Sequence, residues 1–295
     1  MHKSLVFLSC GQRDSERELA KRVESMIRGP LEMDCYNADS VHGFDDVMSI
    51  TEKLAIADYY IMIDFRRDDE VPLSVFAHQE FALARAWALD RMLVFQEEGQ
   101  TSHGMLEYIL AHPIQFTRDN LVDTVRNAIR NQKWESNYSR NLAASDIQPF
   151  DKRVCYKDHT GQYDECIWHL TIQNNRNDKA AVNTIGILDS IRNCNTQETL
   201  DSLDRSYLKW AYQWEGYLHT ILPKDHAVLD AFAIRANEAG VFLHSRWDYY
   251  SKRPVVREFG EYVFTYHIYS ADFPLLTVLV RINYTGPRQV ESNIV

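Results

Sequence analysis

The sequence predicts an α/β domain with a five-stranded, mainly parallel sheet, followed by a second, mainly β domain that resembles a sandwich. Strand and helix signals alternate over about residues 1–135, a polar stretch without periodicity follows, and β-prone runs dominate the remainder. The length of 295 residues suits two domains of roughly 100–200 residues each. We therefore expect an α/β domain at 1–135, a linker at 136–152 and a β-rich domain at 153–295.

The α/β domain is expected from short apolar runs that alternate with amphipathic stretches. The predicted strands are Leu5–Ser9, Leu31–Tyr36, Asp58–Phe65, Arg91–Gln96 and Pro113–Thr117. A first helix is expected from Asp14, and later helices at Val47–Ala57, Leu73–Asp90, Gly104–His112 and Asn120–Lys133. Right-handed crossovers place the carboxyl ends of parallel strands at one edge, where ligands bind in sheets of this kind.

The β-rich half is expected from alternating runs at Glu165–Gln173 and Tyr262–Tyr269 and a long β-prone run at Leu275–Tyr284. Ser206–Tyr217 is compatible with a strand pair or with a helix. The many aromatic residues of this half are expected in its core, with a binding patch as the alternative. His169, His244 and His267 share no ligand-type spacing, so we expect no metal. Further strand candidates are Ala180–Leu188, Leu229–Arg235 and Val241–Arg246.

Charge and cysteine content exclude several classes of protein. The formal net charge of −10 disfavours binding to nucleic acid or to an anionic membrane surface. No apolar stretch reaches 18 residues, so we expect no membrane-spanning helix. Five cysteines form an odd set without a CxxC pair, which disfavours a disulfide framework and a zinc ribbon. We expect a cytoplasmic protein with reduced thiols.

Two motifs of the first half suggest a family. The first strand ends in Val6-Phe7-Leu8-Ser9, and the helix after the third strand carries Ser74 and, six positions later, Glu80. In their order along the chain these motifs resemble the TIR-domain family, bacterial NADase type, whose fold is related to the nucleoside deoxyribosyltransferases. The resemblance covers about 130 residues and implies a flavodoxin-like sheet.

The resemblance also implies a reaction. Catalytic TIR domains cleave the bond between nicotinamide and ribose in NAD⁺ with a helix glutamate, and Glu80 stands at the matching position. Nicotinamide is already cationic in NAD⁺, so the enzyme must stabilise positive charge on the ribose, which a carboxylate does electrostatically or through a covalent ester. NAD⁺ would be the substrate, with no further cofactor. The alternative is that Glu80 is a solvated helix carboxylate.

Substrate-binding candidates lie at the carboxyl ends of the first and third strands and in nearby loops. Backbone amides after the first strand could bind phosphate, although a plain strand-to-helix turn explains the same residues. A phosphate contact by Arg66 or Arg67 competes with simple pairing to Asp68, Asp69 and Glu70. Phe44 could pack over a base or nicotinamide ring, or it could form a hydrophobic staple with the helix that follows. The candidates are Ser9, Cys10, Gly11, Arg13, Phe44, Asp64, Phe65, Arg66 and Ser74.

Two residues of the third predicted helix are expected to be structural. His78 is two positions from Glu80 and should point to roughly the opposite side of the helix. Trp87 is expected to pack in the core. TIR proteins often have an aromatic residue where Cys10 stands, so base stacking is not expected at that position.

Three functions remain open from the sequence. The first is an NAD⁺ glycohydrolase that self-associates and responds to a trigger bound by the β-rich domain, by resemblance an effector of prokaryotic anti-phage defence. The second is N-glycosidic transfer or hydrolysis on a nucleoside or nucleotide, whose neutral leaving base needs a second carboxylate such as Asp39, Asp45 or Asp64. The third is a non-enzymatic adaptor in which Glu80 is dispensable.

Overall fold

The structure, a computed structural model, divides into two compact units, His2–Arg140 and Asn141–Val295, which are described separately. Only the backbone is described at 44–49, 154–158, 161–164 and 200. The described residues are 3–37, 44–67, 74–87, 89–100, 113–150, 154–158, 161–200, 207–212, 217–236, 238–244, 253–286 and 289–295.

The first unit contains a parallel five-stranded sheet in the order β2-β1-β3-β4-β5. This is the flavodoxin-like strand order, which confirms the predicted fold class. The strands are β1 (Leu5–Cys10), β2 (Asp34–Asn37), β3 (Tyr59–Asp64), β4 (Met92–Glu97) and β5 (Ile114–Phe116). The described helices are α1 (Asp14–Arg28), α2 (Phe44–Ile56), α3 (Val75–Ala86) and α5 (Leu121–Asn131).

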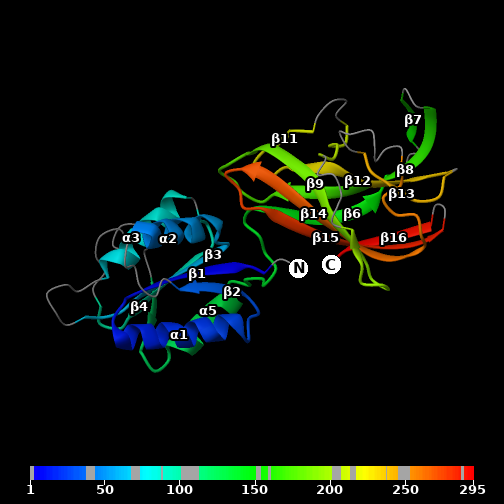
Figure 1. Ribbon diagram of the computed structural model, residues 1–295. Coiled ribbons are helices and arrows are strands. Elements are labelled where there is room, and N and C mark those ends of the chain that lie inside the picture. The colour runs from blue at the N-terminus through cyan, green and yellow to red at the C-terminus, as the bar shows by residue number, and fades with distance from the viewer. Residues whose placement is uncertain are drawn as a thin grey trace. The chain divides into compact units, whose positions relative to one another are not determined.

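Helices cover both faces of this sheet, with α1 and α5 on one side and α2 and α3 on the other (Figure 1). Because side chains alternate along a strand, each strand contributes to two cores. Val6, Leu8 and Cys10 of β1 belong to the core of α1 and α5. Phe7 of the same strand packs with Tyr60 and with residues of α2 and α3. The continuous apolar runs of β1 and β3 therefore reflect burial on both faces.

Residues after α5 pack back onto the first unit. Trp134 stacks on Tyr59, with ring centroids 4.2 Å apart. The buried Asp58 carboxylate accepts from the backbone N–H groups of Leu5 (2.9 Å) and Arg140 (2.7 Å). Asp58 thus joins the start of β1 to the end of the unit.

The second unit consists of antiparallel sheets. One has the order β10-β9-β14-β15-β16 with β11 beside β9, and the other has the order β13-β12-β8-β6 with β7 beside β8. Figure 1 shows the strands of this unit. They are β6 (Leu142–Pro149), β7 (Val154–Asp158), β8 (Gly161–Asn174), β9 (Ala181–Asn193), β10 (Thr199–Leu200), β11 (His219–Ile221), β12 (His226–Arg235), β13 (Val241–Phe242), β14 (Gly260–Ala271), β15 (Leu276–Gly286) and β16 (Gln289–Ile294).

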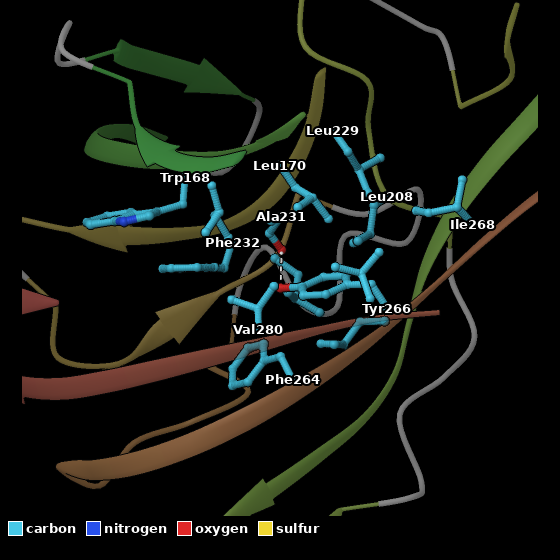
Figure 2. Packing of buried hydrophobic residues seen from close by; sticks show 14 of the residues in the cluster. Trp168, Leu170, Leu208, Leu229, Ala231, Phe232, Phe264, Tyr266, Ile268 and Val280 are labelled. Carbon is cyan, nitrogen blue, oxygen red and sulfur yellow. Dashed lines mark hydrogen bonds between the residues drawn. The ribbon is translucent and has the colours of Figure 1, made fainter. Parts of the chain in front are cut away.

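The core of the second unit draws side chains from both sheets, as expected for a sandwich (Figure 2). Trp168 of β8 stacks on Phe232 of β12, with centroids 4.9 Å apart. The Tyr266 hydroxyl of β14 donates to the Ala231 carbonyl of β12 at 3.2 Å, the dashed line in Figure 2. The aromatic residues Trp168, Trp210, Tyr262 and Tyr266 are buried, as the sequence predicts for a β core.

A buried charged cluster lies on the other face of β8 and β12. Glu165 accepts from Arg235 Nε at 2.6 Å and lies 2.6 Å from His244 Nε2. Asp230 lies 3.3 Å from His169 and 3.7 Å from His244. Burial opposes charge on His244, but hydrogen bonds and attraction from Asp230 and Glu165 raise its pKa to about 9. His244 is therefore a cation at neutral pH and holds two carboxylates together.

Several expectations differ from the structure or fall outside it. The expected linker at 136–152 contains β6, which pairs with β8. Only Leu142 and Ile147 of β6 are buried, and its register shifts between Ala144 and Asp146, so the strand shows no regular alternation in the sequence. Within Ser206–Tyr217, Tyr207 and Trp210 form isolated bridges to Ile187 of β9 and Leu229 of β12. The helix expected at Gly104–His112 lies outside the described residues. None of the described helices has the length and apolar character needed to cross a membrane.

Candidate functional site

The two central strands direct polar side chains toward α3. Ser9 follows Phe7 on β1, and Asp64 follows Tyr60 and Met62 on β3, each at even spacing. Since Phe7, Tyr60 and Met62 belong to the core of α2 and α3, the alternation places Ser9 and Asp64 on the same face. Both residues lie at the carboxyl ends of their strands, the edge where ligands bind in doubly wound sheets.

Helix α3 supplies the opposing side chains. It begins after Ser74, whose hydroxyl caps the helix by accepting from the Ala77 N–H at 3.4 Å. Its buried residues include Ala77, Glu80 and Phe81. His78 and Glu80 are about 200° apart around the helix axis, so they flank this buried stripe on opposite sides. Glu80 meets Ser9 on one flank, and His78 meets Asp64 on the other.

The Ser9–Glu80 pair joins β1 to α3. The Ser9 hydroxyl donates to Glu80 Oε2 at 2.5 Å. Ser9 is fully buried and Glu80 is 8% exposed. Burial raises the pKa of the Glu80 carboxyl to about 7, although the hydrogen bond from Ser9 lowers it. Near neutral pH the carboxyl is therefore divided between its acid and base forms, as general acid–base catalysis requires.

Three other polar atoms on this face are buried without a hydrogen-bond partner: the Tyr60 hydroxyl, Asp64 Oδ1 and His78 Nε2. The last two are 3.9 Å apart, which is too far for a direct hydrogen bond. Asp64 Oδ2 accepts from Gln96 of β4 at 3.5 Å, and Gln96 accepts from Gln115 of β5 at 3.2 Å. Unsatisfied buried groups are costly and occur at functional sites, so this face is the strongest candidate for ligand binding.

Other predicted site residues lie away from Glu80. Cys10 and Phe65 belong to the core of α1 and α5, on the opposite face of the sheet. Phe65 packs edge-on against Phe116 at 5.6 Å. Strand alternation explains this separation, because neighbouring residues of one strand cannot face the same side. The residues expected in a single site thus lie on two faces of the sheet. Ser74 caps α3. The substrate contacts expected of these residues stay predictions.

Gly11 and Arg13 lie at the start of α1, beside a buried ion pair. Arg67 donates to both carboxylate oxygens of Glu16, at 2.9 and 2.6 Å, and Glu16 is 1% exposed. The Arg13 N–H also donates to Glu16, at 3.2 Å. A Cβ at Gly11 would lie 1.9 Å from Glu16 Oε2 and 2.5 Å from Arg67. Here glycine makes room for the ion pair.

Gly11→Ala should therefore destabilise the protein. The added methyl group forces the Glu16 carboxylate away from Arg67, and we expect a loss of about 2 kcal/mol in the free energy of unfolding. Urea denaturation monitored by circular dichroism measures it. Gly286→Ala is the control, because its Cβ would come no closer than 3.4 Å to another side chain. Equal stability of the two variants would contradict the role assigned to Gly11.

Arg66 and Arg118 form a second charged group at this edge. The Arg66 N–H donates to Glu97 at 2.9 Å, and Arg118 Nε donates to the same carboxylate at 2.9 Å. The Arg118 guanidinium also lies 5.7 Å from the centre of the Phe65 ring. The expected partners Asp68, Asp69 and Glu70 lie outside the described residues, as do Asp39 and the side chains of Phe44 and Asp45.

Sequence reasoning missed Glu16 and Tyr60. A glutamate in the first turn of a helix usually faces solvent, and only the tertiary structure brings Arg67 to it. Tyr60 lies within a β-prone run that gives no sign of a polar role, although its even spacing from Asp64 predicts that both face the same side of the sheet. Within the described residues, no group of three or more His, Cys, Asp or Glu side chains is placed to hold a metal ion.

The first unit is thus a doubly wound α/β structure with a buried acid at the strand ends. The chain matches no protein-family model and no curated protein. Among solved structures it is similar to the CMP N-glycosidase BcmB of Clostridium botulinum, with 17% identity over 42% of this chain and 99% of that one, at a TM-score of 0.33. It is also similar to the elongation factor SelB of Methanococcus maripaludis, with 10% identity over 100% and 69%, at a TM-score of 0.35. These scores are too low to support a function, which therefore depends on the geometry of the site.

Proposed function

We propose that the first unit cleaves an N-glycosidic bond at C1′ of a nucleotide, with NAD⁺ as the first candidate substrate and Glu80 as the catalytic residue. The observation that carries the proposal is the buried Ser9–Glu80 pair at the carboxyl end of β1. A low-polarity environment strengthens the interaction of a carboxylate with a sugar that gains positive charge. The Ser9 hydrogen bond fixes the orientation of the carboxylate before substrate arrives.

For NAD⁺ the working form of Glu80 is the carboxylate. The C1′–N bond breaks with its electron pair leaving on the nicotinamide nitrogen, which becomes neutral and needs no proton. The ribose cation is stabilised by Glu80 and captured by water, which gives ADP-ribose and a proton. We expect Asp64 and His78 to bind polar groups of the substrate through their unsatisfied atoms.

A second candidate is hydrolysis or transfer on a nucleoside or nucleotide with a neutral base. The pKa of about 7 favours it, because much of Glu80 is protonated at neutral pH. A protonated carboxyl can serve as the acid that a neutral leaving base requires. Chromatography of reactions containing NAD⁺ or a panel of nucleosides and nucleotides distinguishes the two candidates by their products.

The two candidates predict opposite pH dependences. If Glu80 acts as a carboxylate on NAD⁺, kcat/KM should rise with pH through about 7, where the group ionises. If Glu80 acts as the acid on a neutral base, kcat/KM should fall through the same range. Initial rates between pH 5 and 9 measure the profile, and rates that do not change across this range would contradict catalysis by Glu80.

The second unit and self-association complete the proposal. We propose that the β-rich unit binds a trigger or mediates assembly, and that the enzyme acts as a homo-oligomer. The rate per subunit should then increase with protein concentration. An adaptor without catalysis is the competing function, and it predicts no turnover with any nucleotide at any concentration.

A further inference from the structure

The Tyr60 hydroxyl is a buried polar group that the proposed reaction does not yet use. Tyr60 is fully buried, its hydroxyl makes no hydrogen bond within the usual distance and angle, and its ring packs against Phe7 and Phe81. A hydroxyl buried without a partner costs free energy, and such groups are retained where they serve a site.

The surroundings of Tyr60 define its available partners. Burial raises the pKa of Tyr60 well above its usual value, and the Glu80 and Cys10 charges raise it further, whereas hydrogen bonding with the Ser9 side chain lowers it. Cys10 points to the opposite face of the sheet, in the core of α1 and α5. The partners that remain on the Tyr60 side are Ser9 and Glu80.

The other titratable groups around this face lie on the far flank of α3, pack on other rings or are exposed. Asp64 and His78 face one another across the other flank of α3. Tyr36 of β2 packs on the Phe7 ring, with centroids 5.4 Å apart. On the described part of α2, Glu52 and Lys53 are exposed. In the register of β1 and β3, Phe7 lies opposite Tyr60 and Ser9 opposite Met62, so Tyr60 is diagonal to Ser9 on the face of the sheet that meets Glu80.

We propose that Tyr60 is a positioning residue for Glu80, donating its hydroxyl hydrogen to Ser9 Oγ while Ser9 donates to the Glu80 carboxylate. This deepens the proposed function and rests on it. A serine oxygen can accept while its own hydrogen is donated, so the three residues form a chain of donors that ends on the carboxylate. Such a chain stabilises the ionised form of Glu80 and fixes the oxygen that faces the substrate.

The chain offers a matched pair of variants for the test. Tyr60→Phe removes the hydroxyl and keeps the ring that packs against Phe7 and Phe81. Tyr59→Phe is the control: Tyr59 is the preceding residue of β3, is equally buried, and faces the opposite side, where its hydroxyl donates to the Glu135 carbonyl. Both variants lose one buried hydroxyl, but only Tyr60→Phe removes one beside Glu80.

The experiment follows the ionisation of Glu80 by infrared spectroscopy, using the carboxylic-acid band that Glu80→Gln removes. In Tyr60→Phe we expect the midpoint of this titration to move upward by roughly half a pH unit or more, because the carboxylate loses support. The pH midpoint of kcat/KM should move by the same amount. Tyr59→Phe should keep the midpoint of the wild type and only unfold at lower urea concentration.

Two results would overturn the inference: an unchanged Glu80 midpoint in Tyr60→Phe, or an equal shift in Tyr59→Phe. A more stable Tyr60→Phe protein with an unchanged midpoint would show a hydroxyl that is merely buried without a partner. The infrared titration needs no turnover, so it separates this inference from the proposed function. Full activity in Glu80→Gln would refute the function, whereas an unshifted titration refutes only the role of Tyr60.

Discussion

Glu80→Gln should reduce cleavage of the N-glycosidic bond by about 10²- to 10³-fold or more, while the protein remains folded. Glutamine keeps the size of the side chain and can still accept the hydrogen bond from Ser9. It carries no charge to stabilise the ribose cation and no proton to give to a leaving base. The rate is measured by chromatography of nicotinamide or free base released by wild type and variant at several protein concentrations.

The control for this prediction is Gln79→Ala on the same helix. Gln79 is exposed, next to Glu80 in sequence but not on the buried stripe of α3. The control should keep the activity of the wild type. Wild-type rates in Glu80→Gln would mean that the carboxylate is dispensable, as an adaptor requires.

Glu165→Gln should cause the largest loss of stability among the substitutions considered for the second unit. Glu165 is 1% exposed and contacts both Arg235 and His244 at 2.6 Å. The variant removes the carboxylate that these two cations share, and leaves only Asp230 beside His244 at 3.7 Å and the half-exposed Glu238 beside Arg235 at 3.1 Å. Removing one partner of a fully buried ion pair costs about 3–5 kcal/mol, and because Asp230 and Glu238 still compensate part of the charge we expect a loss near the lower end of this range. Urea denaturation of the full chain near pH 7 measures this loss.

Glu261→Gln provides the matched control in the same unit. Glu261 pairs with Arg281 at 3.2 Å, but both side chains are well exposed to solvent. Exposed pairs contribute only about 0–1 kcal/mol, so this variant should unfold near the wild-type urea concentration. If the two variants are equally stable, the charged cluster around Glu165 does not contribute to the fold as we describe.

The fold of the first unit was predictable because its signals are local. Leu5–Leu8 and Tyr59–Ile63 are continuous runs of apolar and aromatic residues, which identifies strands buried on both faces. Helix α1 has polar residues at its start and an apolar stripe that ends before Gly29. In contrast, β6 buries only Leu142 and Ile147, has a register shift between Ala144 and Asp146 and contains Pro149, so it lacks the period of two that identifies a strand.

The candidate site was predictable only in part. The spacing of Ser74 and Glu80 located the acid, but its hydrogen bond joins residues 71 positions apart and could not be derived from either segment. Ser9 and Cys10 face opposite sides of the sheet because side chains alternate along a strand, and this separation is predictable from the sequence. The Glu16–Arg67 pair joins residues 51 positions apart and has no local signal.

The central claim is that Glu80 lies beside the ribose of a bound nucleotide. The most direct test is a crystal structure of Glu80→Gln grown with NAD⁺, since the slow variant should retain uncleaved substrate. We predict that C1′ of the nicotinamide ribose lies in contact with the side chain at position 80, at the carboxyl end of β1 and on the α3 face of the sheet. NAD⁺ bound on another surface, or no bound NAD⁺ at saturating concentration, would contradict the proposal for NAD⁺. If the nucleosides and nucleotides of the substrate panel also bind elsewhere or not at all, catalysis by Glu80 is contradicted.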